Sequence, residues 1–198
     1  MLDVMRLSLN PRQVRFESLV ATLNGQSLSR VRYAAADYGD DTPHWDFGRH
    51  HNPELGVELT LSSGDQLQVS WGSEFVQYGL AVHSGEKPGL WNSKVAMWDV
   101  SAELGWASVR SDTISAALVY WHVSPWSDDQ SSEYPQDLEI VTTSGTSVWV
   151  LAAQLDLSTG RLNGSADEIV VTFDRAFVRE QGFGKYAPEN RLCRISGA

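Results

Sequence analysis

The chain has 198 residues, a formal net charge of −10 and a pI near 4.8. Nucleic acids and anionic membranes bind positively charged surfaces, so we expect neither as a direct partner. The charge instead favours a basic partner, whose approach an acidic face accelerates. Solubility is an alternative reason for an acidic composition, and it stays open here.

The composition is 42% hydrophobic and 20% charged, as in a globular protein with one domain or two small halves that share a core. Cys193 is the single cysteine, so no disulfide can form within the chain, which suits a reducing cytoplasm. Asp3 and Arg6 interrupt any apolar core in the first residues, which are too short and too charged for a signal peptide, and no apolar run reaches the length of a membrane span. We expect a soluble, cytoplasmic protein.

The first part of the chain predicts short strands around turns. Residues 4–9 alternate weakly and predict an opening strand. Asn24-Gly25 is a strong hairpin signal, so residues 16–36 predict two strands joined there. Residues 37–53 are rich in Asp, Gly, Pro and His and predict an irregular loop.

Residues 56–71 read GVELTLSSGDQLQVSW, in which apolar and polar residues alternate on both sides of Ser63-Gly64. This period of two predicts a half-buried antiparallel hairpin. A further strand is expected at residues 75–83. Residues 84–92 combine Gly, Pro and charge, as linkers do, and residues 94–100 predict a connecting strand.

The second part repeats this order. Residues 104–123 resemble residues 23–33 at a shift of about 86, and a second polar loop covers residues 124–136. Residues 137–153 then match residues 56–71 at a shift of about 81, with Ser144-Gly145 in the place of the first turn. After this hairpin we expect a strand at residues 168–174 and then one or two helical turns at residues 176–181.

This repeated order of turns, loops and strands predicts an internal duplication. We expect an all-β (mainly β) protein in which two pseudo-repeated antiparallel halves pack as a sandwich or as paired curled sheets, with little helix. The expected divisions are a first β repeat with an N-terminal strand at 1–83, a linker and connecting strand at 84–100, a second β repeat at 101–183, and a C-terminal tail at 184–198.

Motifs for catalysis are weak in this sequence. The first loop holds a set of metal-ligand residue types, but it lacks the spacing of known zinc motifs. No nucleophile elbow or phosphate loop is present. We therefore expect no enzyme, no cofactor and no bound metal, and keep a metal-dependent enzyme as an alternative. Its ligands would be His44, Asp46, His50, His51 and Glu54.

The two polar loops resemble each other, since each holds a tryptophan, a pair of aspartates and a closing proline. Exposed tryptophan beside acidic residues is a typical recognition feature, because aromatic side chains often carry most of the energy of an interface. We expect the partner-binding residues to be those of these loops. They are Asp40, Asp41, Trp45, Asp46, Trp126, Asp128, Asp129 and Glu133.

A resemblance supports this interpretation. Residues 134–139 (YPQDLE), the turn Ser144-Gly145 and residues 167–173 (DEIVVTF) resemble small uncharacterised bacterial proteins, some of which serve as immunity proteins beside toxins. The resemblance implies a non-catalytic protein-binding protein that neutralises a bacterial toxin by covering its surface. The partner would be a basic toxin domain. The alternatives are a β domain that binds a carbohydrate or another small ligand, and the metal-dependent enzyme described above.

Overall fold

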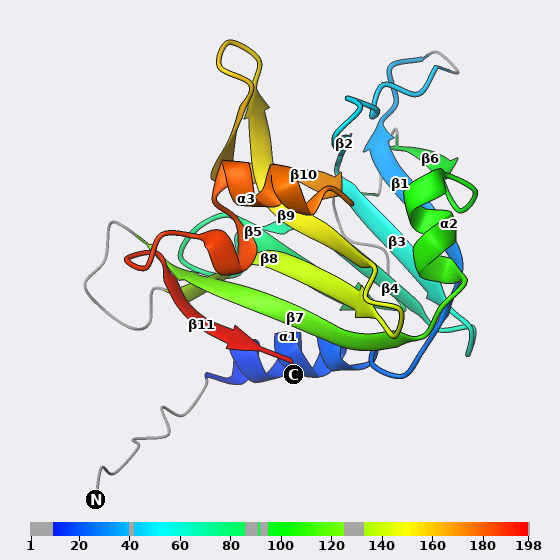
Figure 1. Cartoon of the computed structure of the whole chain (residues 1–198), viewed down its shortest axis with the longest axis horizontal. Helices are drawn as coiled ribbons and strands as arrows, with labels where there is room; N and C mark the ends of the chain where they lie inside the picture. Colours follow the sequence, from blue (N-terminus) through cyan, green and yellow to red (C-terminus); the bar gives the residue numbers. More distant parts are fainter. Residues whose placement is uncertain (1–9, 40–41, 86–90, 92–94, 125–132, 198) are drawn as a thin grey trace, which may run out of the picture.

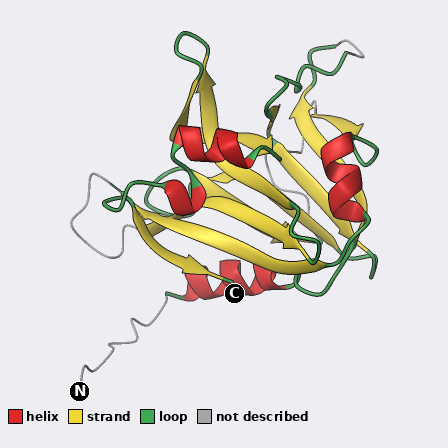
Figure 2. Cartoon of the chain, in the orientation of Figure 1, coloured by secondary structure: helices red, strands yellow, loops and turns green. Residues whose placement is uncertain are grey.

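A computed structural model describes residues 10–39, 42–85, 91, 95–124 and 133–197. These residues form a mainly β structure in which two antiparallel sheets pack face to face, with short helices around them (Figures 1 and 2). The predicted fold class is confirmed. Residues 4–9, expected to form an opening strand, lie outside the described residues. Among the described helices, none is long and apolar enough to cross a membrane.

The first sheet has five strands, and all of its paired neighbours run antiparallel. The first predicted hairpin is confirmed as its centre, and the expected connecting strand forms one edge. The strands, in sheet order, are β5 (Gly79–Ser84), β4 (Gln66–Gly72), β3 (Gly56–Leu61), β1 (Leu28–Ala36) and β6 (Val95–Asp99).

The second sheet has six strands, again all antiparallel, and the second predicted hairpin lies at its centre. A strand from the first half and one from the C-terminal segment form its two edges. In sheet order the strands are β11 (Leu192–Ser196), β7 (Ile114–Val123), β8 (Glu133–Thr142), β9 (Ser147–Asp156), β10 (Arg161–Thr172) and β2 (His51–Glu54).

The helices named in the described part of the chain are α1 (Pro11–Ala21), α2 (Leu104–Arg110) and α3 (Arg175–Gln181), together with the 3₁₀ turn η3 (Gly184–Tyr186). The hairpin predicted around Asn24-Gly25 is wrong, because a helix precedes that turn. Asn10 caps α1 by accepting a hydrogen bond from the Gln13 amide, and the Gln13 side chain accepts one from the Asn10 amide. The helical turns predicted near residue 176 are confirmed as α3.

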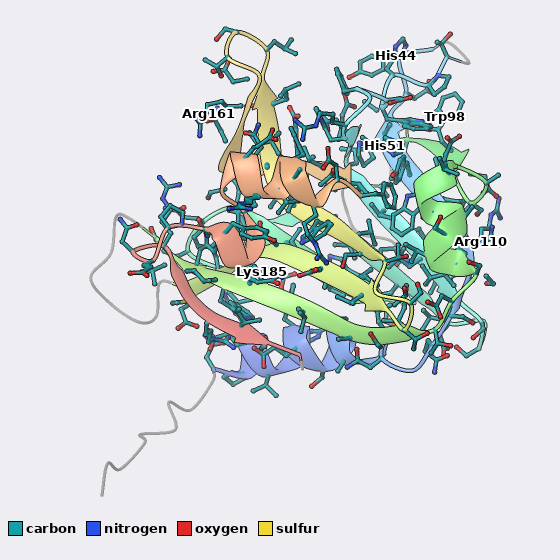
Figure 3. The ribbon with its side chains drawn as sticks, in the orientation of Figure 1. His44, His51, Trp98, Arg110, Arg161 and Lys185 are labelled. Atoms are coloured by element: carbon teal, nitrogen blue, oxygen red, sulfur yellow. The ribbon has the colours of Figure 1, made fainter. Side chains whose placement is uncertain are left out.

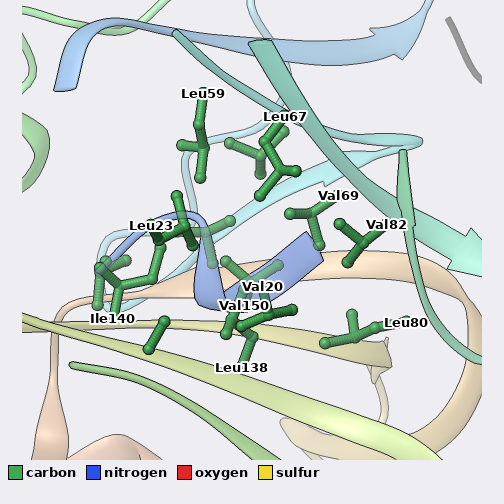
Figure 4. Packing of buried hydrophobic residues seen from close by; sticks show 14 of the residues in the cluster. Val20, Leu23, Leu59, Leu67, Val69, Leu80, Val82, Leu138, Ile140 and Val150 are labelled. Carbon is green, nitrogen blue, oxygen red and sulfur yellow. The ribbon is translucent and has the colours of Figure 1, made fainter. Parts of the chain in front are cut away.

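One hydrophobic core joins the two sheets. Leu59 and Val69 of the first sheet pack with Leu138, Ile140 and Val150 of the second, and all five are fully buried (Figure 4). Helix α1 adds its buried apolar side chains to the same cluster. Neither half therefore buries its apolar face without the other.

The two sheets contain the same order of connected strands. The first sheet has the order β5-β4-β3-β1-β6. The second sheet has the matching order β10-β9-β8-β7-β11, and β2 is an additional strand that pairs with the outer edge of β10. The registers also correspond: Val31 pairs with Leu59, and Ala117 with Ile140, at the 86- and 81-residue shifts seen in the sequence. A common origin of the halves stays a prediction, but their positions can be compared pair by pair.

A second, smaller cluster lies on the other face of the second sheet. Side chains alternate along β9, so that Val148 and Val150 enter the shared core while Trp149 and Leu151 point to the opposite face. There α3 and η3 cover them (Figure 1). This cover turns a sheet face that would otherwise meet water into a buried surface.

Candidate functional site

The described part of the chain contains a cavity of about 640 Å³ at one end of the sandwich. One wall is the connection between β4 and β5, at residues 73–78. The facing wall is the start of β10 and the end of α3, while β7 and β8 supply the floor. This volume lies within the range typical of small-ligand pockets, roughly 300–1,000 Å³.

An interruption of the β9–β10 ladder shapes the β10 wall. Pairing shifts between Gly164 and Ile169, and Ser165 adopts a left-handed backbone with a φ of 59°. The Ser165 amide donates a hydrogen bond of 2.9 Å to Oε1 of Gln136, whose Nε2 donates to the carbonyl of Ala152 at 2.7 Å. The bulge is therefore held by a buried glutamine rather than by the strand ladder.

The wall from the first half is tied to the second half by side-chain hydrogen bonds. Gln77 donates from Nε2 to Oγ of Ser124 at 2.6 Å, and its Oε1 accepts from Oγ of Ser165 at 2.8 Å. Gly79 sits so close to β8 that a Cβ there would lie 2.8 Å from the carbonyl oxygen of Pro135. The cavity is thus built where the two halves meet.

His122 lines the cavity, and Asp137 lies directly behind it. The two side chains are almost completely buried, and 3.8 Å separates His122 Nε2 from Asp137 Oδ2. Asp137 Oδ2 accepts a hydrogen bond of 2.6 Å from the Gly184 amide of η3. His122 Nε2 and Asp137 Oδ1 have no hydrogen-bond partner among the described residues.

Burial shifts both pKa values toward the uncharged forms. Loss of hydration raises the pKa of Asp137 from 3.8 to about 7, although the Gly184 amide and the Gln136 side chain act against this rise. Loss of hydration, with a smaller contribution from the positive charge of Arg191, lowers the pKa of His122 from 6.5 to about 4. Between these two values both groups are neutral in the folded protein.

The same positions in the first half carry no ionisable group. Tyr120 pairs with Asp137 in the second sheet, and the equivalent pair in the first sheet is Ala34 with Gly56. Tyr120 donates a 2.6 Å hydrogen bond to the buried Glu139, and burial raises its pKa. Glu139 has a buried counterpart in the first half, Glu58, whereas Asp137 stands where the first half has Gly56. A buried carboxyl group costs free energy, so the presence of Asp137 in the second half indicates a role beyond the fold that both halves share.

Most side chains around the cavity are aromatic rings, amides or hydroxyls. Tyr134 lies edge-on to His122, with 6.0 Å between ring centroids, and burial raises the pKa of Tyr134 to about 12. Phe183 forms part of the α3 wall. Arg191, just before β11, is the one arginine or lysine among the described residues that line the cavity. This set suits a polar ligand with a flat or apolar part.

Three of the eight predicted partner-binding residues lie in the described part of the chain. Trp45 was expected to be exposed, and this is wrong: it is 7% exposed and packs edge-on against Tyr33 at 5.2 Å between ring centroids. Asp46 is exposed and accepts from the Gly48 amide. Glu133 accepts from Gln13 and Arg194. Five further residues of this set lie outside the described residues: Asp40, Asp41, Trp126, Asp128 and Asp129.

The alternative metal ligands of the first loop serve separate contacts. His50 stacks between Phe47 and Phe177, while His51 Nδ1 lies 2.7 Å from the Tyr33 hydroxyl. Glu54 accepts hydrogen bonds from the Tyr38 hydroxyl and the Ala36 amide, and His44 lies further out on the loop (Figure 3). Across the described ranges, no group of three or more His, Cys, Asp or Glu is placed to hold a metal ion.

A second cavity of about 570 Å³ lies between α2 and α3. Leu104, Trp149 and Phe173 give it an apolar side, and Arg175 lies over the Trp149 ring, 6.0 Å from its centroid. Its described lining residues include no buried pair of ionisable side chains like His122 and Asp137, so the first cavity is taken as the candidate site.

Comparisons with known proteins give no relative: no family model, no curated protein and no solved structure matches this chain.

Proposed function

We propose that the protein is a binding protein whose main site is the cavity above His122, and that its ligand is a small polar molecule. The observation that carries the proposal is the buried pair of His122 and Asp137 below a cavity of ligand size, at positions where the first half has no ionisable residue. Buried groups with shifted pKa values beside a pocket are typical of functional sites.

The described residues favour binding over catalysis as the proposed role. The amides around the cavity are held by neighbours: Gln77 and Gln136 each use both ends of the side chain in hydrogen bonds. A rigid polar wall of this kind selects a ligand by shape and hydrogen bonding with little cost of ordering.

We expect Asn163→Trp to abolish ligand binding. Asn163 is exposed and lines the cavity on β10, so an indole there occupies ligand space without disturbing the core. Leu157→Trp is the matched control, because Leu157 is 81% exposed on the same β9–β10 unit and does not line the cavity. The measurement is thermal unfolding with neutral sugars, polyols, amino acids and carboxylates, since a ligand that binds the folded state raises Tm.

The expected result is that one class of compound raises Tm in the wild type and in Leu157→Trp but not in Asn163→Trp. Both variants should unfold near the wild-type Tm without ligand, which shows that each is folded. An equal rise of Tm in Asn163→Trp and wild type would place the ligand elsewhere and contradict the proposal.

A protein partner is the second candidate, and the net charge of −10 together with apolar side chains on the cavity rim favours it. Val76 and Tyr78 line the cavity and are 53% and 44% exposed. Exposed apolar residues within an acidic surface suit a basic protein, such as the toxin domain that the resemblance suggests. The predicted acidic residues of the two polar loops stay part of this proposal.

We expect a toxin encoded by a neighbouring gene to bind the wild type more tightly than the variant Val76→Ser with Tyr78→Ser. Loss of apolar contact area weakens an interface, and added salt should slow association because the partner is basic. Calorimetric titration and its salt dependence give the measurement. Equal affinity of the two forms would remove the cavity rim from the interface.

A further inference from the structure

We infer that the ligand of this cavity carries an anionic group, a carboxylate or a phosphate, which the guanidinium of Arg191 and the floor around His122 recognise. The inference rests on the proposed function, because it names the class of ligand for that same cavity. It is not a consequence of overall charge, since a chain with a net charge of −10 repels anions at a distance. The local chemistry of the cavity carries it.

The first step is the sign of the charge that lines the cavity. Arg191 is the only lining residue among those described that is ionised at all ordinary pH values, and no aspartate or glutamate lines the space. Asp137 stands behind the lining, and its raised pKa keeps a large share of it protonated near neutral pH. Among the described lining residues, the fixed charge that a ligand in the cavity meets is therefore positive, in a protein whose net charge is −10.

The second step is that Arg191 is available. The described ion pairs and hydrogen bonds engage other arginines, such as Arg49 with Asp174 and Arg194 with Glu133, and none includes the guanidinium of Arg191. Its charge acts on His122 and Tyr134, since it lowers the pKa of both groups. Arg191 lines the cavity together with His122 and Tyr134, and the planar donors of a guanidinium fit two oxygens of one anionic group.

The third step is the floor. His122 lines it, with the Tyr134 ring edge-on beside it, while its Nε2 faces Asp137 behind the lining. An anion near His122 favours protonation of the imidazole, which opposes the effects of burial and of Arg191. Arg191 and His122 then act on the anionic end, while Phe183 and the amides of the walls contact the rest of the molecule.

The test compares three pairs of probes that differ mainly in charge: benzoate with benzamide, succinate with succinamide, and glucose 6-phosphate with glucose. Each is titrated by calorimetry into the full chain as wild type, Arg191→Gln, Arg161→Gln and Asn163→Trp. Arg161 is the matched control, since it is exposed on β10 and does not line the cavity (Figure 3). Carboxylate and phosphate probes separate the two sources of anionic charge.

The expected result is that at least one anion binds about tenfold or more tightly than its neutral counterpart, because a hydrogen bond to a charged group contributes more than one between neutral groups. Arg191→Gln should lose that advantage, Arg161→Gln should keep it, and Asn163→Trp should bind neither probe. Anionic and neutral probes that bind equally in the wild type and are both lost in Asn163→Trp overturn the anion inference and leave the proposed function standing.

Two further outcomes are decisive. If none of the three anions binds at millimolar concentration, the inference is overturned. If an anion binds equally well to Asn163→Trp and the wild type, its site lies elsewhere, which overturns both the inference and the proposed function.

Discussion

Replacing Asp137 with asparagine is expected to raise the free energy of unfolding by about 4 kcal/mol at about pH 8, and to change it little at about pH 4. The folded state raises the pKa of Asp137 from 3.8 to about 7, so the folded protein holds a proton there that the unfolded chain has released. The stability that this group gives the wild type is therefore complete below the unfolded pKa of 3.8. It is lost as the pH rises through the folded pKa of about 7. Asparagine has no such loss, and its carbonyl oxygen still accepts from the Gly184 amide.

Urea unfolding of wild type and Asp137→Asn across this range of pH is the measurement. Taking the difference between the two proteins cancels the contribution of titrating groups that lie far from Asp137, while the neighbouring His122 is followed by its own variant. His122→Gln is the opposing control. Because the folded pKa of His122 is lowered from 6.5 to about 4, wild-type stability from this group is lost as pH falls. The His122→Gln variant should therefore gain stability, relative to wild type, at low pH. An Asp137→Asn difference that stays constant with pH would contradict the account of the floor.

Replacing Leu59 or Ile140 with alanine is expected to lower the free energy of unfolding by about 2–5 kcal/mol, because each deletion leaves a cavity in a packed core. The two residues occupy equivalent positions on the two sheets, and both have 0% exposure within one shared cluster. Leu157→Ala is the matched control: its side chain is 81% exposed, and the change should stay within about 0.5 kcal/mol.

The shared core gives this prediction a second part. Tryptophan fluorescence and far-UV circular dichroism should report the same single transition in each variant, since neither sheet can unfold while the other keeps its apolar face covered. Two separate transitions in either buried variant would show that the halves are independently stable units. A loss below about 1 kcal/mol at either position would show that the interface between the sheets is looser than the structure indicates.

Most of the sheet architecture was predictable because its signals are local. The hairpins at Ser63-Gly64 and Ser144-Gly145 alternate with period two, and this pattern fixes both the strand and the face that it buries. Helix α1 also has a local signal, the Asn10-Gln13 capping box, but the turn at Asn24-Gly25 suggested a hairpin instead. In the structure the Gly25 amide donates to the carbonyl of Ile114, so this turn joins the two halves.

The candidate site was not predictable in the same way. Asp137 and Glu139 alternate with Leu138 and Ile140, and such a pattern normally places the acidic residues in water. Asp137 is buried by η3, which lies more than forty residues further along the chain. The alternation of residues within a strand does not reveal that a distant segment will cover it. The predicted exposure of Trp45 was wrong for the same reason. Its acidic neighbours suggested exposure, whereas contact with Tyr33 buries it.

The most direct test of the account is a map of amide chemical-shift changes across the protein during titration with an anion that raises its Tm. The account predicts that the largest changes fall around the first cavity, at Gly164, Ser165 and Gly182, and that the equivalent face of the first sheet near Gly56 stays unchanged. Changes centred on the second cavity, near Gly105 and Thr146, would contradict the assignment of the binding site to the cavity above His122.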